Sequence, residues 1–255
     1  MWDTDRGDSA VRPVTIVTGG SRGIGAATCL RLAADGHDLA LGYVGNRAAA
    51  EEAADAVRAA GARCVTVQGD TSDEAAVERL FDVARAELGP VTGLVNNAAV
   101  TGPLGRLADA RTEDIRRVLD VNVLGVLLCC RRAARDMAAS GGGAIVNISS
   151  GAATLGSPGE YVHYAATKAA VDTLTLGLSK ELGPDGIRVN AVAPGAVTTD
   201  MHAAMGDPGR AARVGAQTPL GRPGAPAEIA AAVAWLLSAD ASYTTGAVLR
   251  VAGGR

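Results

Sequence analysis

Hydrophobic and polar positions divide the chain into two kinds of segment that alternate from end to end. Short apolar runs rich in valine, leucine and isoleucine are typical of strands that are buried on both faces. Longer stretches between them carry apolar residues at helical spacing. The strands we predict are Val14–Val17, Leu39–Tyr43, Cys64–Val67, Val91–Val95, Ala144–Ile148, Ile187–Val192 and Ala247–Val251. The helices we predict are Ala26–Ala34, Ala48–Ala60, Asp73–Leu88, Glu113–Ala139, Val162–Leu182 and Ala227–Leu237.

This alternation predicts an α/β fold, because parallel strands must be joined by crossover segments, which are usually helices. We expect a doubly wound, Rossmann-like, parallel seven-stranded sheet with helices on both faces. No linker divides the pattern, so residues 13–255 are expected to form a single domain after a flexible polar leader at residues 1–12. The one long irregular stretch, Thr198–Gly224, directly follows a strand, and it is expected to be a substrate lid at about 198–224.

Residues that favour helix starts support several of these boundaries. Thr71 followed by Glu74 has the spacing of a capping box, and Thr112 is expected to begin the long helix. Pro226 stands where a first-turn proline belongs.

Composition and charge narrow the range of functions. A net charge of −3 with 20% charged residues gives no polycation for nucleic acid, so we expect no nucleic-acid partner. No apolar run approaches the roughly 20 residues of a membrane span, and the polar first residues lack the pattern of a signal peptide. We therefore expect a cytoplasmic protein without a membrane partner. The four cysteines lack zinc-ligand spacing, so we expect them to be buried apolar residues and expect no metal.

A glycine-rich turn follows the first strand and precedes a helix. Its sequence is Thr18-Gly19-Gly20-Ser21-Arg22-Gly23-Ile24-Gly25. Glycines allow a tight turn and a close approach to a pyrophosphate, while the following helix start offers free N–H groups. The turn therefore predicts a dinucleotide site. It also contains G-x-S-x-G, the serine hydrolase pattern, but no preceding strand and loop complete an oxyanion hole, and Gly25 would be unexplained.

Positive charge near the second strand favours NADP(H) over NAD(H). An NAD site would place an acid after that strand, but the chain has Asn46 and Arg47 there, while Arg22 lies in the glycine turn. Two guanidinium groups suit a 2′-phosphate. Asp70 follows the third strand, where it either accepts from the adenine amino group or caps the next helix together with Thr71.

A tyrosine and a lysine share one helix face. Only two of the 24 basic residues are lysines, and one of them, Lys168, follows Tyr164 by four positions. At that spacing, an ammonium near the phenol can lower its pKa by stabilising the phenolate. The pair therefore indicates acid–base chemistry.

With these residues in view, the chain resembles the short-chain dehydrogenase/reductases of the shorter single-domain type, from Val14 to Gly254. The family motif T-G-x-x-x-G-x-G matches the glycine turn, and its N-N-A-G segment appears as Asn96-Asn97-Ala98-Ala99, with alanine in place of the last glycine. The resemblance assigns the catalytic positions to Asn122, Ser150, Tyr164 and Lys168, although Ser149 is an alternative to Ser150. It adds cofactor contacts at Asn97, Pro194, Gly195, Val197 and Thr199.

The resemblance also implies a division of roles. Tyr164 would be the general acid in reduction and the base in oxidation, and Lys168 would lower its pKa and also bind the nicotinamide ribose. Ser150 would donate to the substrate oxygen, and Asn122 would hold a water that relays protons from Lys168. The expected reaction interconverts a carbonyl and a secondary alcohol on a small-molecule ketone or alcohol.

Several alternatives for substrate and assembly stay open. A carrier-bound 3-oxoacyl substrate is one, with Arg131, Arg132 and Arg135 able to dock its acidic carrier, although we favour a solvated or subunit-facing helix for these arginines. A catalytically silent NADP-binding sensor or structural subunit is another. A sugar-nucleotide epimerase shares the Tyr-x-x-x-Lys pair but needs a longer chain. Met201, His202 and Met205 are expected to line the pocket, and a homotetramer or dimer is implied through the long helices.

Overall fold

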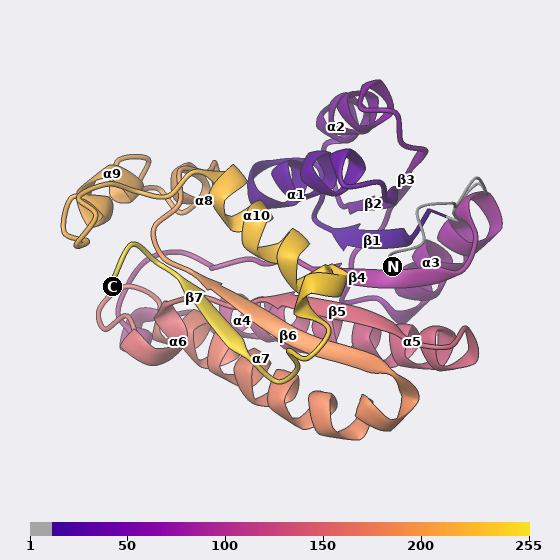
Figure 1. Cartoon of the computed structure of the whole chain (residues 1–255). Coiled ribbons are helices and arrows are strands. Elements are labelled where there is room, and N and C mark those ends of the chain that lie inside the picture. The colour runs from indigo at the N-terminus through magenta and orange to yellow at the C-terminus, as the bar shows by residue number, and fades with distance from the viewer. Residues whose placement is uncertain (1–11) are drawn as a thin grey trace.

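Seven parallel strands form the centre of the molecule (Figure 1), a computed structural model that describes residues 12–255. Their order across the sheet is β3-β2-β1-β4-β5-β6-β7. The strands are β1 Val14–Thr18, β2 Asp38–Tyr43, β3 Cys64–Gln68, β4 Val91–Asn96, β5 Gly143–Ile148, β6 Ile187–Pro194 and β7 Val248–Val251. The order reverses between β1 and β4, which opens a crevice at their carboxyl ends, where ligands bind in such sheets.

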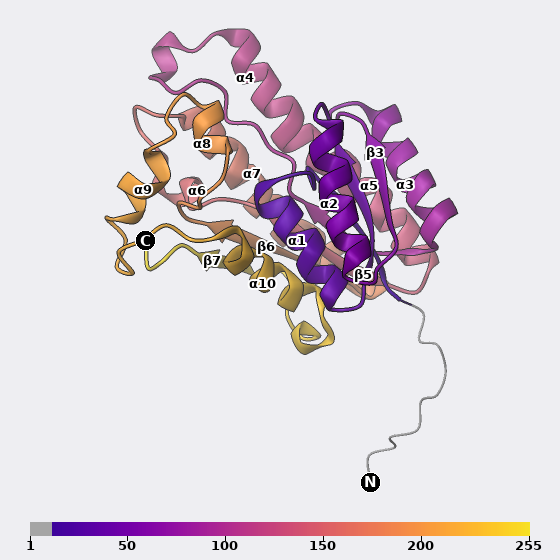
Figure 2. The same cartoon turned by 90° about the horizontal axis from the view of Figure 1, so that it is seen from above.

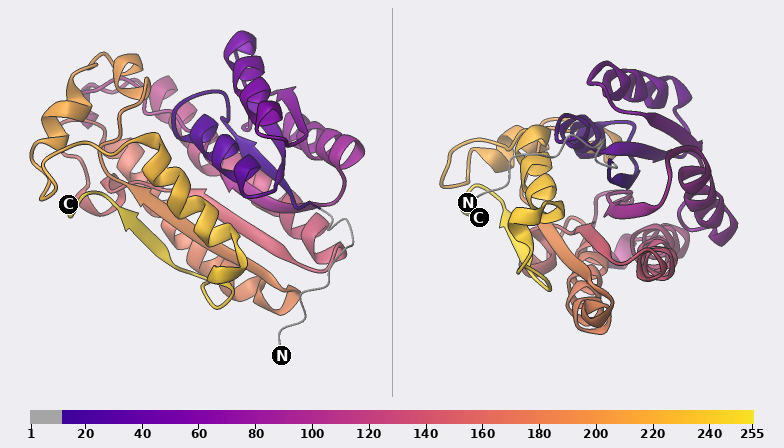
Figure 3. Two further views of the ribbon diagram at one scale, coloured as in Figure 1. Left: turned by 45° about the horizontal axis from the view of Figure 1, so that its top comes forward. Right: turned by 45° about the vertical axis from the view of Figure 1, so that its right-hand side comes forward.

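Helices cover both faces of the sheet, as the end view in Figure 3 shows. One face carries α1 Gly23–Ala34, α2 Arg47–Ala59 and α10 Pro226–Leu237. The other face carries α3 Glu74–Leu88, α5 Gly125–Ala139 and α7 Val162–Glu181. The predicted fold class is therefore confirmed.

The alternating direction of side chains along each strand builds a core on each face. In β1, Val14 and Ile16 pack with α3, α5 and α7, whereas Val17 packs with α1 and α10. The four cysteines are buried and free, as expected. Burial raises the pKa of Cys64 to about 11, so this thiol is unreactive at neutral pH.

Some helix boundaries differ from the prediction. The expected helix Glu113–Ala139 is divided into α4 Thr112–Leu119, a π-helical turn η2 at Asp120–Leu124, and α5. Thr71 does not cap α3, because Asp73 is its N-cap and accepts from the N–H of Ala75 at 3.0 Å. Pro226 begins α10 as predicted, and Glu228 accepts from the N–H of Ala225 at 2.8 Å.

The expected lid, Thr198–Gly224, is more regular than the sequence suggested. It contains α8 Met201–Ala204 and α9 Arg210–Gly215, which lie beyond the carboxyl ends of the strands (Figure 2). Its two ends are held together, because Val197 pairs with Gly224 and the N–H of Thr198 donates to the Gly224 carbonyl at 3.0 Å. Residues 1–11 of the expected leader lie outside the described residues, and Arg12 pairs with Asp38.

The shorter segments complete the chain between these elements. Helix α6 Ala152–Leu155 follows β5, and short 3-10 turns occur at η1 Leu107–Asp109, η3 Gly183–Asp185 and η4 Ala239–Ala241. None of the helices in residues 12–255 has both the length and the apolarity that crossing a membrane requires.

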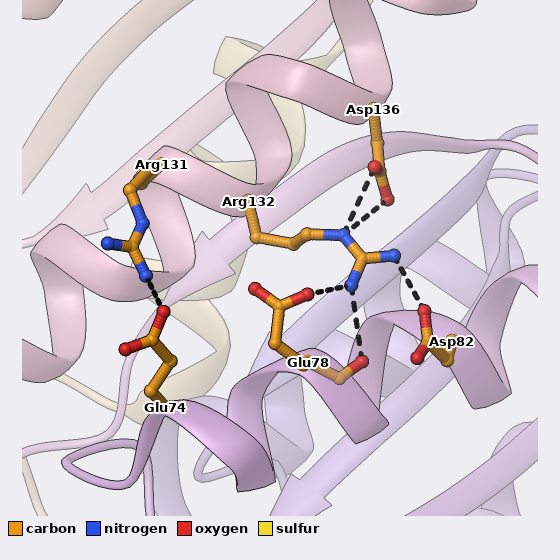
Figure 4. A network of polar contacts seen from close by, with 6 residues as sticks. All are labelled: Glu74, Glu78, Asp82, Arg131, Arg132 and Asp136. Carbon is orange, nitrogen blue, oxygen red and sulfur yellow. Dashed lines mark hydrogen bonds and ion pairs between the residues drawn. The ribbon is translucent and has the colours of Figure 1, made fainter.

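Arg132 on α5 joins two helices through a cluster of carboxylates (Figure 4). Its guanidinium pairs with Glu78 and Asp82 on α3 and with Asp136 on its own helix. It also lies 5.6 Å from the centre of the Phe81 ring. The adjacent Arg131 pairs with Glu74, so two of the three arginines considered as a carrier dock are already paired with carboxylates.

Replacing Arg132 by leucine is expected to lower the free energy of unfolding by about 2 kcal/mol. Three carboxylates would then face one another without a cation, although the exposed Asp82 can turn to water. Urea denaturation followed by circular dichroism measures the loss. The matched control is Arg131→Leu, which removes an exposed pair and is expected to cost less than about 1 kcal/mol. An equal loss of unfolding free energy in the two variants would contradict the larger contribution expected from the ion pairs of Arg132.

Candidate active site

Thr18 fixes the glycine turn against the end of β4. Its hydroxyl oxygen accepts from the N–H groups of Asn97 at 3.0 Å and Ala98 at 3.1 Å. The Asn97 amide in turn donates to the carbonyls of Thr18 at 3.0 Å and Gly19 at 2.9 Å. The two segments predicted to bind a cofactor therefore meet at the crevice between β1 and β4.

The glycines of the turn are required by this close packing. Gly19 has a φ of +64°, and a Cβ on Gly25 would lie 2.2 Å from the Gly19 carbonyl oxygen. Gly23 has a φ of +55° and lies beside Thr199, to which a Cβ would come within 3.3 Å. The segment from Pro194 to Thr199 therefore reaches the glycine turn, as the resemblance implied.

The start of α1 is suited to a pyrophosphate. Arg22 is its N-cap, in extended backbone, and no side chain caps the first N–H groups. These groups and the positive end of the helix dipole are therefore available to an anion, while Ser21 and Ile24 lie within the same turn. The residues present thus fit the phosphates of a dinucleotide.

A hollow beside the turn lies at the carboxyl ends of β1, β2 and β3. Its walls include Gly19, Tyr43, Asp70 and Ala98. Asp70 does not cap α3 with Thr71. It accepts from the backbone and hydroxyl of Ser72 and pairs with Arg117 at 2.6 Å. Burial raises the pKa of Asp70, but these contacts outweigh it and hold the pKa below its usual value. An adenine contact for Asp70 stays a prediction.

The side chains expected near a 2′-phosphate lie at the surface. Asn46 caps α2 by accepting from the N–H of Ala49 at 3.0 Å, so its oxygen is used within the protein. Arg22 and Arg47 are exposed, and among residues 12–255 neither guanidinium forms an ion pair or hydrogen bond. Both arginines can therefore bind an anion without losing an internal contact.

Ser150, Tyr164 and Lys168 come together at the end of β5. The Ser150 side chain lies near the Tyr164 phenol, where it acts to lower the pKa of that phenol. The Lys168 ammonium donates to the Ile148 carbonyl at 2.7 Å and lies 5.6 Å from the centre of the Tyr164 ring. Tyr164 and Lys168 are both buried, at 7% and 2% exposure. The structure thus brings together three of the four predicted catalytic residues.

Ser149 points away from this cluster. It is buried, and its hydroxyl donates to the Lys168 carbonyl at 3.3 Å. Adjacent residues of an extended segment face opposite sides, which explains why only one serine meets the tyrosine. The geometry therefore favours Ser150 over Ser149 as the residue that contacts substrate.

The protein's own residues do not lower the pKa of Tyr164, which corrects the simple expectation from the Tyr-Lys spacing. Burial raises this pKa, and the nearby Ser150 side chain only partly offsets the rise. Burial also lowers the pKa of Lys168 to about 8, and Asp172 opposes that change. The lysine therefore remains mostly protonated at pH 7, and its ammonium points to a carbonyl rather than to the phenol.

Asn122 lies in the π-helical turn and is fully buried. Its side chain accepts from the N–H of Val100 at 2.9 Å and donates to the Val100 carbonyl at 2.8 Å. It also donates to Thr167, whose hydroxyl donates to the Tyr164 carbonyl at 2.7 Å. The side chain thus connects α7 to the segment after β4, which favours a positioning role, while the water-holding role stays a prediction.

The substrate side of the cluster is apolar. Val118, Tyr161, Tyr164 and Met205 form a buried group against which other lid and loop residues pack. The partly buried members are Val100, Leu104 and Met201. Expected lid residues therefore do lie next to the tyrosine. His202 is also buried, but its Nε2 bonds with the Val197 carbonyl at 3.0 Å.

Sequence reasoning missed Tyr161 and Arg210. The rings of Tyr161 and Tyr164 meet edge to face with centres 5.1 Å apart, and the Arg210 guanidinium lies 5.0 Å from the centre of the Tyr161 ring. Tyr161 had a weak signal, three positions before Tyr164 at helical spacing. Arg210 had none, because nothing in an arginine-rich chain marks which arginines become buried.

Comparison with known proteins gives matches over almost the whole chain. A family model described as enoyl-(acyl carrier protein) reductase matches residues 19–255. The uncharacterized oxidoreductase YgfF of Escherichia coli K12 is 48% identical over 95% of this chain and 99% of its own. The cis-4-hydroxycyclohexanecarboxylate dehydrogenase of Sinomonas cyclohexanicum is 41% identical over 97% of this chain and 98% of its own.

Solved structures show the same fold. A short-chain dehydrogenase/reductase from Serratia marcescens has a TM-score of 0.88 and 37% identity, covering 96% of this chain and 98% of its own. A blue fluorescent protein from a metagenomic library, solved in complex with NADPH, has a TM-score of 0.86 and 37% identity, covering 95% and 97%.

Proposed function

The chain belongs to the short-chain dehydrogenase/reductase family, and we propose that it is an NADP(H)-dependent oxidoreductase that interconverts a carbonyl and a secondary alcohol on a small molecule. The observation that carries this proposal is the meeting of Ser150, Tyr164 and Lys168 at the carboxyl end of β5, on the same edge of the sheet as the glycine turn after β1. When bound, the nicotinamide supplies the hydride. The protein must then orient the substrate and move one proton.

The residues divide that task in a way their contacts support. Tyr164 donates the proton to the substrate oxygen in reduction, and its raised pKa keeps it protonated for that step. Ser150, which lies near the phenol, orients the same oxygen. Lys168, on the same helix face, would hold a ribose hydroxyl of the bound cofactor, and Asn122 holds the tyrosine's helix in place through Thr167.

NADPH consumption in the presence of a panel of ketones tests the proposal. The named substrate of the Sinomonas relative is a hydroxylated ring, so small cyclic ketones are the first choice for the panel. Turnover that follows added ketone would support the oxidoreductase. NADPH binding without turnover of any ketone would instead favour the silent sensor or subunit.

A carrier-bound substrate is a second candidate, because the matching family model is named for an acyl carrier protein substrate. The pairing of Arg131 and Arg132 with carboxylates argues against their use as a carrier dock. We therefore favour a free small molecule as the substrate.

A cytoplasmic location stays a prediction. A homo-oligomer is also part of the proposal, supported by exposed Leu119, Leu124 and Leu127 along α4, η2 and α5.

The NADP preference has its own test in the double variant Arg22→Ala/Arg47→Ala. We expect kcat/KM for NADPH to fall about 10- to 100-fold while that for NADH changes little, because charge-assisted hydrogen bonds to the 2′-phosphate are lost. Steady-state kinetics with both cofactors measure the ratio. Arg85→Ala removes an exposed arginine from α3 and should leave the ratio unchanged. A ratio unaltered in the double variant would contradict the 2′-phosphate role.

A further inference from the structure

The lid carries a buried cation close to the proposed acid. Arg210 begins α9, within the Thr198–Gly224 segment, and is only 8% exposed. Its guanidinium lies over the Tyr161 ring, and that ring meets the ring of Tyr164. One aromatic ring therefore separates the Arg210 charge from the residue that would donate the proton. Burying a guanidinium is unfavourable unless its hydrogen-bonding groups find partners.

The hydrogen-bonding capacity of Arg210 is only partly used. Glu160, which precedes α7, accepts from Nη2 and keeps 39% of its side chain exposed. The Nε of Arg210 is buried and has no hydrogen-bond partner among the described residues. The Nδ1 of His202, on the neighbouring α8, also has no partner, but the ring's Nε2 donates to a carbonyl, so Nδ1 can only accept and offers nothing to an anion. Buried donors without partners are uncommon in folded proteins, and the free Nε of Arg210 in the lid therefore indicates a ligand with an acceptor atom.

The surrounding charges favour an anionic ligand of low charge. Within residues 12–255, Glu160 is the one carboxylate that pairs with Arg210, while nearby Asp207 pairs with Arg213. Burial lowers the pKa of His202, so this ring is neutral and supplies no second positive charge. One guanidinium, already paired with Glu160, is the positive charge at this site. It therefore matches a singly charged carboxylate better than it matches a doubly charged group.

The apolar side chains around the two tyrosines set the other part of the ligand. Val100, Leu104, Met201 and Met205 border the two tyrosines, so the body of the substrate must be largely hydrocarbon. A molecule that fits has an apolar frame, a hydroxyl or carbonyl at Tyr164, and an anionic group at the lid.

Resting on the oxidoreductase function proposed above, we infer that Arg210 binds a carboxylate on the substrate, and that the enzyme acts on hydroxy- or oxocarboxylates with an apolar frame. Arg210 is then a specificity residue rather than an acid or base. Its contact is the same before and during the reaction, so it acts mainly on KM.

The test compares 4-oxocyclohexanecarboxylate with its neutral methyl ester, using NADPH and the full chain. The wild-type protein is expected to prefer the acid by about 10- to 100-fold in kcat/KM, the range for hydrogen bonds to a charged group. Arg210→Gln should remove this preference, mainly through KM for the acid, and should change ester turnover only slightly. Glu160→Gln should strengthen the preference, because it removes a competing carboxylate.

Arg213→Gln is the matched control, since Arg213 lies on the same helix but is exposed and paired with Asp207. It should keep the preference for the acid. Cyclohexanecarboxylate gives a second readout that needs no turnover: calorimetry with the NADPH-loaded protein should detect binding to the wild type and to Arg213→Gln, but not to Arg210→Gln.

Several outcomes would overturn the inference. Equal turnover of acid and ester by the wild type would do so while leaving the proposed oxidoreductase intact. An acid preference that persists in Arg210→Gln, or equal loss of acid and ester turnover in that variant, would show a structural role only. Absence of NADPH binding and of turnover with any ketone would instead refute the proposed function itself.

Discussion

Replacing Tyr164 by phenylalanine is expected to lower kcat by about 1,000-fold or more while NADPH still binds with wild-type affinity. General acid–base catalysis by one positioned side chain contributes roughly 10²- to 10⁴-fold, and Tyr164 is the phenol that lies near Ser150. The ring is retained, so its edge-to-face contact with Tyr161 persists and the fold should be unaffected.

Initial rates at saturating NADPH and a fluorescence titration of NADPH separate the two effects. Tyr243→Phe is the control, because Tyr243 is fully exposed and far from the site along the chain. A phenylalanine variant with near-normal kcat would refute the assignment of Tyr164. A variant that loses NADPH binding as well would show that the phenol acts in cofactor binding rather than in proton transfer.

Gly25→Ala is expected to weaken NADPH binding by at least about 100-fold and to lower the free energy of unfolding by about 1 to 3 kcal/mol. The added methyl group would lie 2.2 Å from the Gly19 carbonyl oxygen and 2.6 Å from the Asn97 amide nitrogen. Neither can move alone, because Asn97 holds the Gly19 carbonyl and the end of β1 together. The glycine turn must therefore shift away from the position that suits a pyrophosphate.

Gly183→Ala is the control for this substitution. A Cβ at Gly183 meets no atom within 4 Å, so both stability and NADPH affinity should stay near those of the wild type. Calorimetric NADPH titration and urea denaturation measure the two quantities. Normal affinity in Gly25→Ala would mean that the turn tolerates a side chain there, and the dinucleotide site would have to lie elsewhere.

Local patterns account for most of what could be predicted. The strands were found because residues such as Ile16 and Val17 face separate cores, which makes their runs continuously apolar. The glycine turn was found because a tight backbone approach leaves a mark at fixed spacing. Tyr164 and Lys168 were found because a helix places residues four apart on one face.

Long-range contacts account for what could not be predicted. The π-helical turn accompanies the bonds of Asn122 to Val100, which lies 22 positions earlier, so no local pattern announces it. The choice of Ser150 over Ser149 depends on how β5 sits against α7. The burial of Arg210 depends on the lid folding over Tyr161, a contact between residues 49 positions apart.

The lid follows β6 and closes on itself just before α10, since Val197 pairs with Gly224 and the N–H of Thr198 donates to the carbonyl of the same glycine. Such an arrangement makes the intervening segment a cassette. Its length and sequence can drift without disturbing the strands, because doubling a closed loop costs only about 0.6 kcal/mol. Gene duplicates with this bridge can therefore diverge in substrate specificity through the lid. The residues that bind the nicotinamide cofactor stay under separate selection.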